Sequence, residues 1–333
     1  MDRKDPLLSH QYEAANSLSE NFDNVIVVTG KIGEVQPNPR IKIFSTGWIP
    51  GDRWGNLRRL FKVSLPIIVR GRFSSVFFHM TDLQCALLAP IIRLRGKRQF
   101  LWYAHTFKSK YLVFSSWWVT NIVTSTSGSC PISGSIVKPI GQAIDEKKFA
   151  PLSFDELDFS KLIHIGRFDK SKNIQLLIIS ARELRAIYSD MQLTLIGSPA
   201  NTESRDWARN LKLETESDVR EGWLVFKDSL PRDLFPREVS KNGCFFHGYI
   251  GSLDKTLVES TMLRVPVVTI NPEYTAIFGT WGNSNEISLT SEYLALRSRS
   301  RIEVNAELER RLSIARTEHS LKHWVRELSF LLQ

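Results

Sequence analysis

Short runs of β-branched and aromatic residues alternate with amphipathic segments of helical length along all 333 residues of this chain. This alternation restricts the fold more than any other feature, because it is typical of parallel sheets whose strands are joined by crossover helices. The clearest helix candidate is 173–188, where apolar residues recur at helical spacing and predict one face packed on a sheet. The predicted strands are 24–30, 41–47, 74–80, 99–105, 121–127, 136–142, 161–167, 191–198, 222–228, 243–248, 266–271 and 286–290.

A chain of this length fits two domains of about 150 residues each. We place the boundary near Ala150–Pro151, where the segment FAPLSFDELDFS interrupts the strand pattern, and therefore expect domains 1–150 and 151–333. The charged, amphipathic helices near 304–332 are suited to packing back across the other domain.

The chain opens with a predicted helix at 9–22 and not with the buried strand that usually starts a doubly wound domain. Either that strand is missing or translation starts upstream of Met1. The N-terminus has no apolar signal-peptide region, and no run of about 18 apolar residues occurs. The three cysteines, Cys85, Cys130 and Cys244, form no CxxC pair. We therefore expect neither a disulfide framework nor a zinc site, and a reducing compartment.

Positive charge is concentrated in the first half of the chain. Residues 1–150 hold 20 lysines and arginines against 10 aspartates and glutamates, which leaves 24 against 25 of the totals of 44 and 35 for residues 151–333. A basic half suggests nucleic acid, an anionic membrane surface or phosphorylated substrates as partners. In 47–73 the cations are mixed with tryptophan and aliphatic residues, which suits contact with anionic lipid headgroups as well as an ordinary solvated face. The cations in question are Arg53, Arg58, Arg59, Lys62, Arg70 and Arg72, followed by a second group at Arg93, Arg95, Lys97 and Arg98.

The segment HIGRFDKSKNIQLLIISA (164–181) reads as a strand, a Gly-Arg turn, a lysine and a helix. Arg167 and Lys172 lie on either side of that turn, so both side chains can reach the carboxyl edge of the sheet, where open α/β sheets bind ligands. An arginine fork beside a lysine point charge suits a diphosphate leaving group, on which negative charge accumulates. A simple structural cap of the strand is the alternative.

A second segment, FFHGYIGSLDKTLVESTMLRVPVVTIN (245–271), reads as a strand, a Gly-Ser loop, a helix carrying Glu259 and a further strand. The start of this helix, near Ser252–Lys255, is a candidate phosphate site, because backbone N–H groups and the positive end of the helix dipole meet there. Glu259 is placed to accept hydrogen bonds from ribose hydroxyls, although a single glutamate on a helix is more often solvated.

In this order and spacing, the two segments resemble the retaining glycosyltransferases of family 4, which have the GT-B fold of two facing Rossmann-like domains. LWYAH (101–105) is similar to the family's strand that ends in a histidine beside the donor sugar, and VKPIGQAIDEKKF (137–149) is similar to the element that closes its N-terminal domain. The resemblance implies a metal-independent hexosyltransferase that moves a sugar from a nucleotide-diphosphate donor to a polyprenyl-linked or polysaccharide acceptor. Such an enzyme is expected in the cytoplasm, peripheral to the inner face of the membrane.

By this resemblance the catalytic residues are His105, Arg167 and Lys172. The implied donor-binding residues are Gly166, Arg167, Lys172, Ser252, Leu253, Asp254, Lys255 and Glu259, and the implied membrane and acceptor side carries Arg53, Arg58, Arg59 and Lys62. Two positions depart from the family pattern. Gly251 stands where the first glutamate of the Glu-x7-Glu motif is expected, and Arg264 stands where a glycine is expected. The missing sugar contact must come from another residue, such as Asp254 or Lys255, or be lost.

No cofactor and no metal are expected, since no cluster of histidine, cysteine and aspartate has ligand spacing. No carboxylate presents itself as a covalent nucleophile, so retention implies acceptor attack on the face that the diphosphate leaves, aided by charge stabilisation and positioning. Contacts to the nucleotide base are expected near Phe226–Leu230, chiefly through the backbone. The alternatives are a catalytically silent binding module and a sugar-nucleotide epimerase or hydrolase of the same fold. Nucleic acid is not an expected partner, because the sequence lacks a recognition motif.

Overall fold

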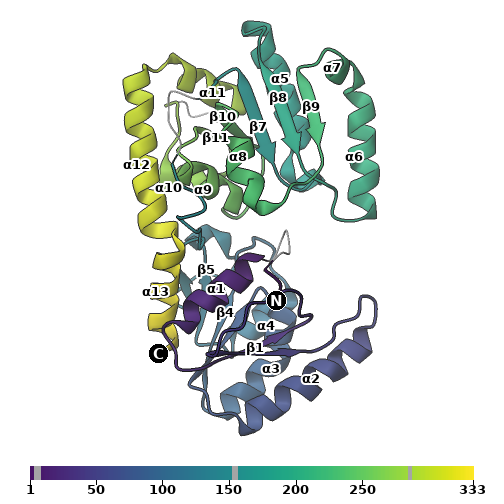
Figure 1. Cartoon of the computed structure of the whole chain (residues 1–333), viewed down its shortest axis with the longest axis vertical. Coiled ribbons are helices and arrows are strands. Elements are labelled where there is room, and N and C mark those ends of the chain that lie inside the picture. The colour runs from purple at the N-terminus through teal and green to yellow at the C-terminus, as the bar shows by residue number, and fades with distance from the viewer. Residues whose placement is uncertain (4–8, 152–156, 284–286) are drawn as a thin grey trace. The chain divides into compact units, whose positions relative to one another are not determined.

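The computed structural model describes residues 1–3, 9–151, 157–283 and 287–333, and in it the chain forms two compact units (Figure 1). The first unit comprises Met1–Ala143 together with Leu321–Gln333, and the second comprises Ile144–Ser320. The division therefore falls earlier than the predicted boundary at Ala150–Pro151, and the C-terminal segment belongs to the first unit instead of the second.

The chain enters and leaves the second unit at neighbouring positions. The backbone N–H of Ile144 donates to the carbonyl of His319 at 2.9 Å, and Ile144 forms an isolated parallel bridge with Ser320. The side chain of Ile144 is fully buried in the core of the second unit. The two ends of this unit are thus fastened to each other.

The first unit is an α/β structure with two parallel sheets. Strands β1 (Val25–Thr29) and β2 (Ile41–Ser45) form one sheet. The other sheet has the order β3-β4-β5-β6, with β3 at Ser75–His79, β4 at Arg98–Trp102, β5 at Asn121–Thr124 and β6 at Val137–Pro139. The α-helices are α1 (Ser9–Ser19), α2 (Arg53–Arg70), α3 (Asp82–Leu94), α4 (Lys110–Ser116) and α13 (Leu321–Leu332).

Helix α13 covers one face of the four-stranded sheet. Its buried Trp324 and Leu328 pack in one cluster with Phe100 and Trp102 of β4. Leu101 lies between these two strand residues and points to the opposite face, where it packs in the cluster of α3 and α4. An amphipathic helix such as α13 must bury its apolar stripe, and this requirement explains why the end of the chain returns to the first unit.

The second unit contains one parallel sheet of five strands in the order β11-β10-β7-β8-β9. The strands are β7 (Lys161–Ile165), β8 (Gln192–Ile196), β9 (Leu224–Lys227), β10 (Cys244–His247) and β11 (Val267–Thr269). The α-helices are α5 (Ile174–Ile187), α6 (Thr202–Glu214), α7 (Glu216–Arg220), α8 (Phe235–Val239), α9 (Lys255–Met262), α10 (Pro272–Phe278), α11 (Leu289–Ser298) and α12 (Arg301–His319).

The strand order of this sheet marks where a ligand would bind. From the central strand β7 the chain proceeds through β8 and β9 on one side, and then returns to place β10 and β11 on the other side. The loops that follow β7 and β10 consequently leave the sheet in opposite directions. In open α/β sheets the crevice at such a switch point is the usual ligand site.

One predicted strand is wrong. Residue 286 lies outside the described residues, and 287–290 form no strand, since Leu289 begins helix α11. Ser288 caps this helix: its hydroxyl accepts from Ser291 N–H, and the Ser291 side chain accepts from the backbone of Ser288. A reciprocal cap of this kind stabilises a helix start whatever the β-propensity of the neighbouring residues. The other predicted strands are each present, although β4 ends at Trp102, so that His105 lies in the loop that follows.

Candidate functional site

The loops after β7 and β10 are tied together at the switch point. Asn173 directly follows the 3-10 turn Lys170–Lys172 and adopts a left-handed conformation with φ of 51°. Its side-chain amide donates to the carbonyl of Gly248, just beyond β10, at 2.8 Å. A Cβ on Gly248 would lie 3.1 Å from the Cβ of Asn173, so the absence of a side chain at 248 permits this close approach.

Lys172 lies between these loops and is largely buried, with 11% of its side chain exposed. Its ammonium forms an ion pair with Asp254 and lies 4.1 Å from the centroid of the Tyr249 ring. A buried lysine needs a counter-charge of this kind, because burial alone disfavours its charged form. The site therefore contains a fixed positive charge together with its own internal partner.

Asp254 is held by three groups. Its Oδ2 accepts from Lys172 and from His247 Nε2, the latter at 3.3 Å, and its Oδ1 caps α9 by accepting from Thr256 N–H at 3.2 Å. Burial opposes ionisation of Asp254, but the Lys172 ammonium and the His247 hydrogen bond outweigh it and hold the pKa of the carboxyl well below its ordinary value of 3.8. Asp254 is thus a carboxylate at neutral pH.

Two buried histidines, His164 and His247, lie close to the ion pair of Lys172 and Asp254. Burial lowers the pKa of His247 below its ordinary value of 6.5, so its neutral ring donates from Nε2 to Asp254, and Nδ1 is left to accept from the Thr269 hydroxyl at 3.4 Å. Burial, together with the nearby His247 ring, lowers the pKa of His164 to about 3. His164 donates from Nδ1 to the carbonyl of Phe246 at 2.9 Å. Both histidines lie within strands, as predicted.

Arg167 differs from Lys172 in its exposure to solvent. Its side chain is 55% exposed, and its Nε lies 3.6 Å from Oδ2 of Asp169 on the same loop. Gly166, which precedes it, continues the sheet by donating to the carbonyl of Ile196 at 3.0 Å. The structure places Arg167 at the rim of the carboxyl edge and Lys172 inside it.

Glu259, predicted to bind the ribose, is fully buried, whereas a single glutamate on a helix is more often solvated. Its carboxylate forms an ion pair with Arg232, which belongs to the 3-10 turn Arg232–Leu234 after β9. Arg232, which pairs with Glu259, therefore follows directly after the loop predicted to contact the base, Phe226–Leu230. Sequence reasoning missed Arg232, because no motif links it to a helix that begins more than twenty residues later.

The start of α9 is partly occupied by protein groups. The Asp254 carboxylate caps the helix, and the Leu253 side chain is buried in the core. The side-chain amide of Asn271 donates to the carbonyls of Gly251 and Ser252 at 3.2 and 3.3 Å, which fixes the loop before the helix. A phosphate at this end would meet backbone groups and the side chains of Lys172 and Lys255, and it would also meet the negative charge of Asp254.

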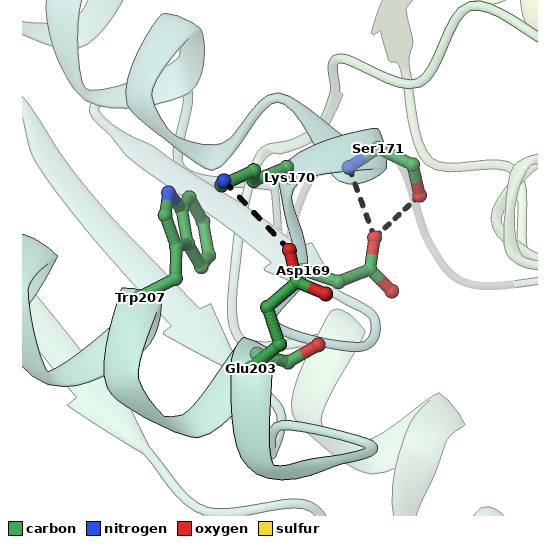
Figure 2. A pocket seen from close by; sticks show the side chains of 6 residues that line it. Asp169, Lys170, Ser171, Glu203 and Trp207 are labelled. Carbon is green, nitrogen blue, oxygen red and sulfur yellow. Dashed lines mark hydrogen bonds and ion pairs between the residues drawn. The ribbon is translucent and has the colours of Figure 1, made fainter.

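A hollow of about 180 Å³ lies beside the β7 loop, between the 3-10 turn Lys170–Lys172 and the start of α6 (Figure 2). Figure 2 shows Trp207 and Glu203 of α6 on one side and Lys170 on the other, with 3.9 Å between Lys170 Nζ and Glu203 Oε1. The predicted donor-binding residues are not among those that line it, so we place the candidate site at the switch point and not in this hollow.

The first unit contains the remaining predicted residues. His105 is exposed, and its Nδ1 accepts from the backbone N–H of Phe107 at 2.9 Å. On α2, Trp54, Arg58 and Lys62 follow one another at intervals of one helical turn and are all exposed. Arg59 is engaged within the unit, 2.8 Å from Asp52 Oδ2.

Within the described part of the chain, no helix is long and apolar enough to cross a membrane. In the same residues, no group of three or more histidine, cysteine, aspartate or glutamate side chains is placed to hold a metal ion.

The sequence matches no protein-family model and no curated protein sequence. Its structure is similar to solved structures along the whole chain. Anabaena HepE in complex with UDP-glucose has a TM-score of 0.74 at 11% identity, covering 100% of this chain and 97% of that one. Sucrose-phosphate synthase from Thermosynechococcus elongatus has a TM-score of 0.71 at 11% identity, covering 96% and 90%. The N-terminal domain of Candida albicans trehalose-6-phosphate phosphatase has a TM-score of 0.70 at 11% identity, covering 97% and 92%. These similarities confirm the predicted GT-B fold with two Rossmann-like domains.

Proposed function

We propose that this chain is a glycosyltransferase that takes a sugar from a nucleotide-diphosphate donor held in its second unit. The observation that supports this most directly is the position of Lys172, a buried cation in the switch-point crevice of a parallel sheet. A cation held there by the fold is suited to the phosphates of a nucleotide. The similar structures in complex with UDP and with UDP-glucose make uridine the first base to test.

In this proposal Lys172 and Arg167 bind the diphosphate, with Gly166 and the backbone of Ser252, Leu253 and Lys255 beside it. Negative charge grows on the diphosphate as its bond to the sugar breaks, and fixed cations stabilise that charge more in the transition state than in the ground state. The acceptor hydroxyl then attacks on the face that the diphosphate leaves and passes its proton to the departing phosphate oxygen, so that the configuration is retained. We propose that transfer needs no metal ion.

Glu259 is proposed to bind the ribose. Since its carboxylate is paired with Arg232, the ribose hydroxyls must either share the carboxylate or displace the guanidinium. Arg232 retains 27% exposure, so it can move toward solvent without opening the core. Asp254 is proposed to lie beside the phosphates as the partner of Lys172, while His105 is proposed for the sugar and acceptor side.

The acceptor is proposed to be lipid-linked or polysaccharide, and α2 is the proposed contact with an anionic membrane. An exposed tryptophan followed by exposed cations on one helical face is the combination that headgroups attract. Arg53 extends this surface at the start of the helix, whereas the ion pair with Asp52 makes Arg59 a weaker contributor.

A catalytically silent binding module is the second candidate, and one observation favours it. Lys172 and Glu259 both carry internal counter-charges, Asp254 and Arg232, so each is satisfied without a ligand. The similarity to the N-terminal domain of a trehalose-6-phosphate phosphatase is a further reason not to infer the activity from the fold. An epimerase or hydrolase of the same fold would use the same donor site and differ in its products.

The test is a thermal-shift screen of the whole chain against UDP, GDP and ADP, followed by product analysis with the matching glucose donor. A ligand at 100 times its dissociation constant raises the free energy of unfolding by about 2.7 kcal/mol. We expect one nucleotide to stabilise the wild type and to lose this effect in Lys172→Ala. Stabilisation without any sugar transfer or hydrolysis would establish the silent module, and the absence of stabilisation by all three would refute nucleotide binding.

A further inference from the structure

Tyr249 occupies the space that a side chain at position 251 would need. A Cβ atom on Gly251 would lie 2.1 Å from the Tyr249 Oη and 2.2 Å from its Cζ, far inside van der Waals contact. The backbone at Gly251 does not itself require glycine, because its φ lies outside the left-handed region. With the phenol ring in this place, position 251 has no room for a side chain.

The same ring covers the ammonium of Lys172. The distance of 4.1 Å from Nζ to the ring centroid lies within the range of cation–π attraction. The loop on both sides of the ring is fixed, because the buried amide of Asn271 donates to the carbonyls of Tyr249 and Gly251 at 3.0 and 3.2 Å. The phenol thus has a defined place next to the proposed phosphate-binding cation.

We propose that Tyr249 binds the donor sugar and that its hydroxyl makes the contact which a side chain at 251 would otherwise make. This inference rests on the proposed function, since it requires a nucleotide sugar whose phosphates reach Lys172. The sugar is bonded directly to the distal phosphate, so a half-buried group in contact with the phosphate-binding cation also lies beside the sugar. A phenol both donates and accepts hydrogen bonds, whereas a carboxylate only accepts them, so the contact can serve either lone pairs or hydroxyl protons of the sugar.

The first experiment separates the sugar contact from packing on Lys172. Dissociation constants for UDP and UDP-glucose are measured by calorimetry on wild type, Tyr249→Phe and Lys172→Ala, with the ADP and GDP pairs in parallel. Tyr249→Phe keeps the ring over Lys172 and removes only the hydroxyl. We expect it to weaken UDP-glucose about 2- to 10-fold, the range for one hydrogen bond, while the dissociation constant of UDP stays unchanged. Equal changes for both ligands, or no change for either, would overturn the assignment.

A second experiment tests the coupling of positions 249 and 251 without any ligand. We expect Gly251→Ala to lower the melting temperature by at least about 2 °C, since the new methyl group displaces the ring. In a Tyr249→Ala background the same substitution should cost little, because the space is then open. Additive effects would show that the ring does not fill the space at 251, and would overturn the proposal.

The two failures are distinguishable. If no nucleotide binds the wild type, the proposed function fails and the sugar assignment falls with it. If binding requires Lys172 but Tyr249→Phe leaves the ratio of UDP to UDP-glucose affinity unchanged, only the assignment of Tyr249 fails.

Discussion

The substitution Asp254→Asn tests whether the Asp254 carboxylate competes with bound phosphates for the Lys172 ammonium. Asparagine caps helices about as well as aspartate, so the hydrogen bond from Thr256 N–H to the capping oxygen should survive, and the substitution removes mainly the negative charge beside Lys172. Breaking a buried ion pair costs about 3–5 kcal/mol of stability. Because the two side chains retain 11% and 17% exposure, we expect a loss near the lower end, about 3 kcal/mol.

Nucleotide binding should change in the opposite direction. In the wild type, a phosphate that approaches Lys172 also approaches the Asp254 carboxylate. A unit charge about 6 Å away contributes about 2.8 kcal/mol at an effective dielectric constant of 20, and partial exposure reduces this to about 1.4 kcal/mol. That difference corresponds to about tenfold tighter binding of UDP by Asp254→Asn.

Calorimetric titration with UDP measures this affinity, and urea unfolding measures the stability. Asp206→Asn is the matched control, since it removes an equal charge from an exposed ion pair on α6 and should alter neither quantity. The double variant Lys172→Ala/Asp254→Asn should lose the gain in affinity. Unchanged or weaker UDP binding by Asp254→Asn would refute the idea that Asp254 competes with the phosphates for Lys172.

Four further outcomes are expected. Lys172→Ala and Arg167→Ala should each lower the rate of sugar transfer by roughly 10², and full activity in either would remove the proposed diphosphate site. Glu259→Gln should lower the free energy of unfolding by about 3 kcal/mol, because it removes the negative member of a largely buried ion pair with Arg232, and Arg232→Met added to it should restore part of that loss in urea unfolding. The pKa of His164 falls from 6.5 to about 3 on folding, so the unfolded chain binds more protons than the folded chain between these values. The free energy of unfolding should therefore fall as the pH is lowered through this window, by up to about 1.4 kcal/mol per pH unit. An equal dependence of this free energy on pH in His164→Gln would contradict the prediction. Replacing Arg58 and Lys62 with serine should weaken binding to anionic vesicles by about 1 kcal/mol per cation, whereas serine at the exposed Arg209 and Arg220 of the second unit should not.

The fold was accessible from sequence because strands such as β4, β7 and β10 are short apolar runs that a parallel sheet buries on both faces. The failed strand at 286–290 shows the limit of that reasoning. Its β-branched residues favour a strand, but the reciprocal cap of Ser288 and Ser291 is a local hydrogen-bond effect that fixes a helix start. The end of β4 at Trp102 was missed for a related reason, since apolar composition continues through Tyr103 and Ala104 after the ladder has ended.

The candidate site was only partly accessible. The spacing of Arg167 and Lys172 indicated one sheet edge, and the structure places both residues there. Nothing in that spacing indicates that Lys172 is buried and paired with Asp254, because this pair depends on the approach of two loops far apart in sequence. The pairing of Glu259 with Arg232 is non-local in the same way. Sequence patterns indicate which loop or helix carries such a residue, whereas its ion-pair partner depends on tertiary contacts.

The bridge between Ile144 and Ser320 has a consequence for how the two units can fold. The second unit is an insertion within the first, and its two ends are bonded to each other, so all of its strands and helices lie in one continuous stretch of chain. The first unit is divided, because α13 follows the whole of the second unit in sequence, and without α13 the β4 face that Trp324 and Leu328 cover would be exposed to water. Domains made during translation usually fold in order from the N-terminus. Here the first unit cannot close its core before the second unit has been made, and a chain truncated before α13 would join a complete second unit to an aggregation-prone first one.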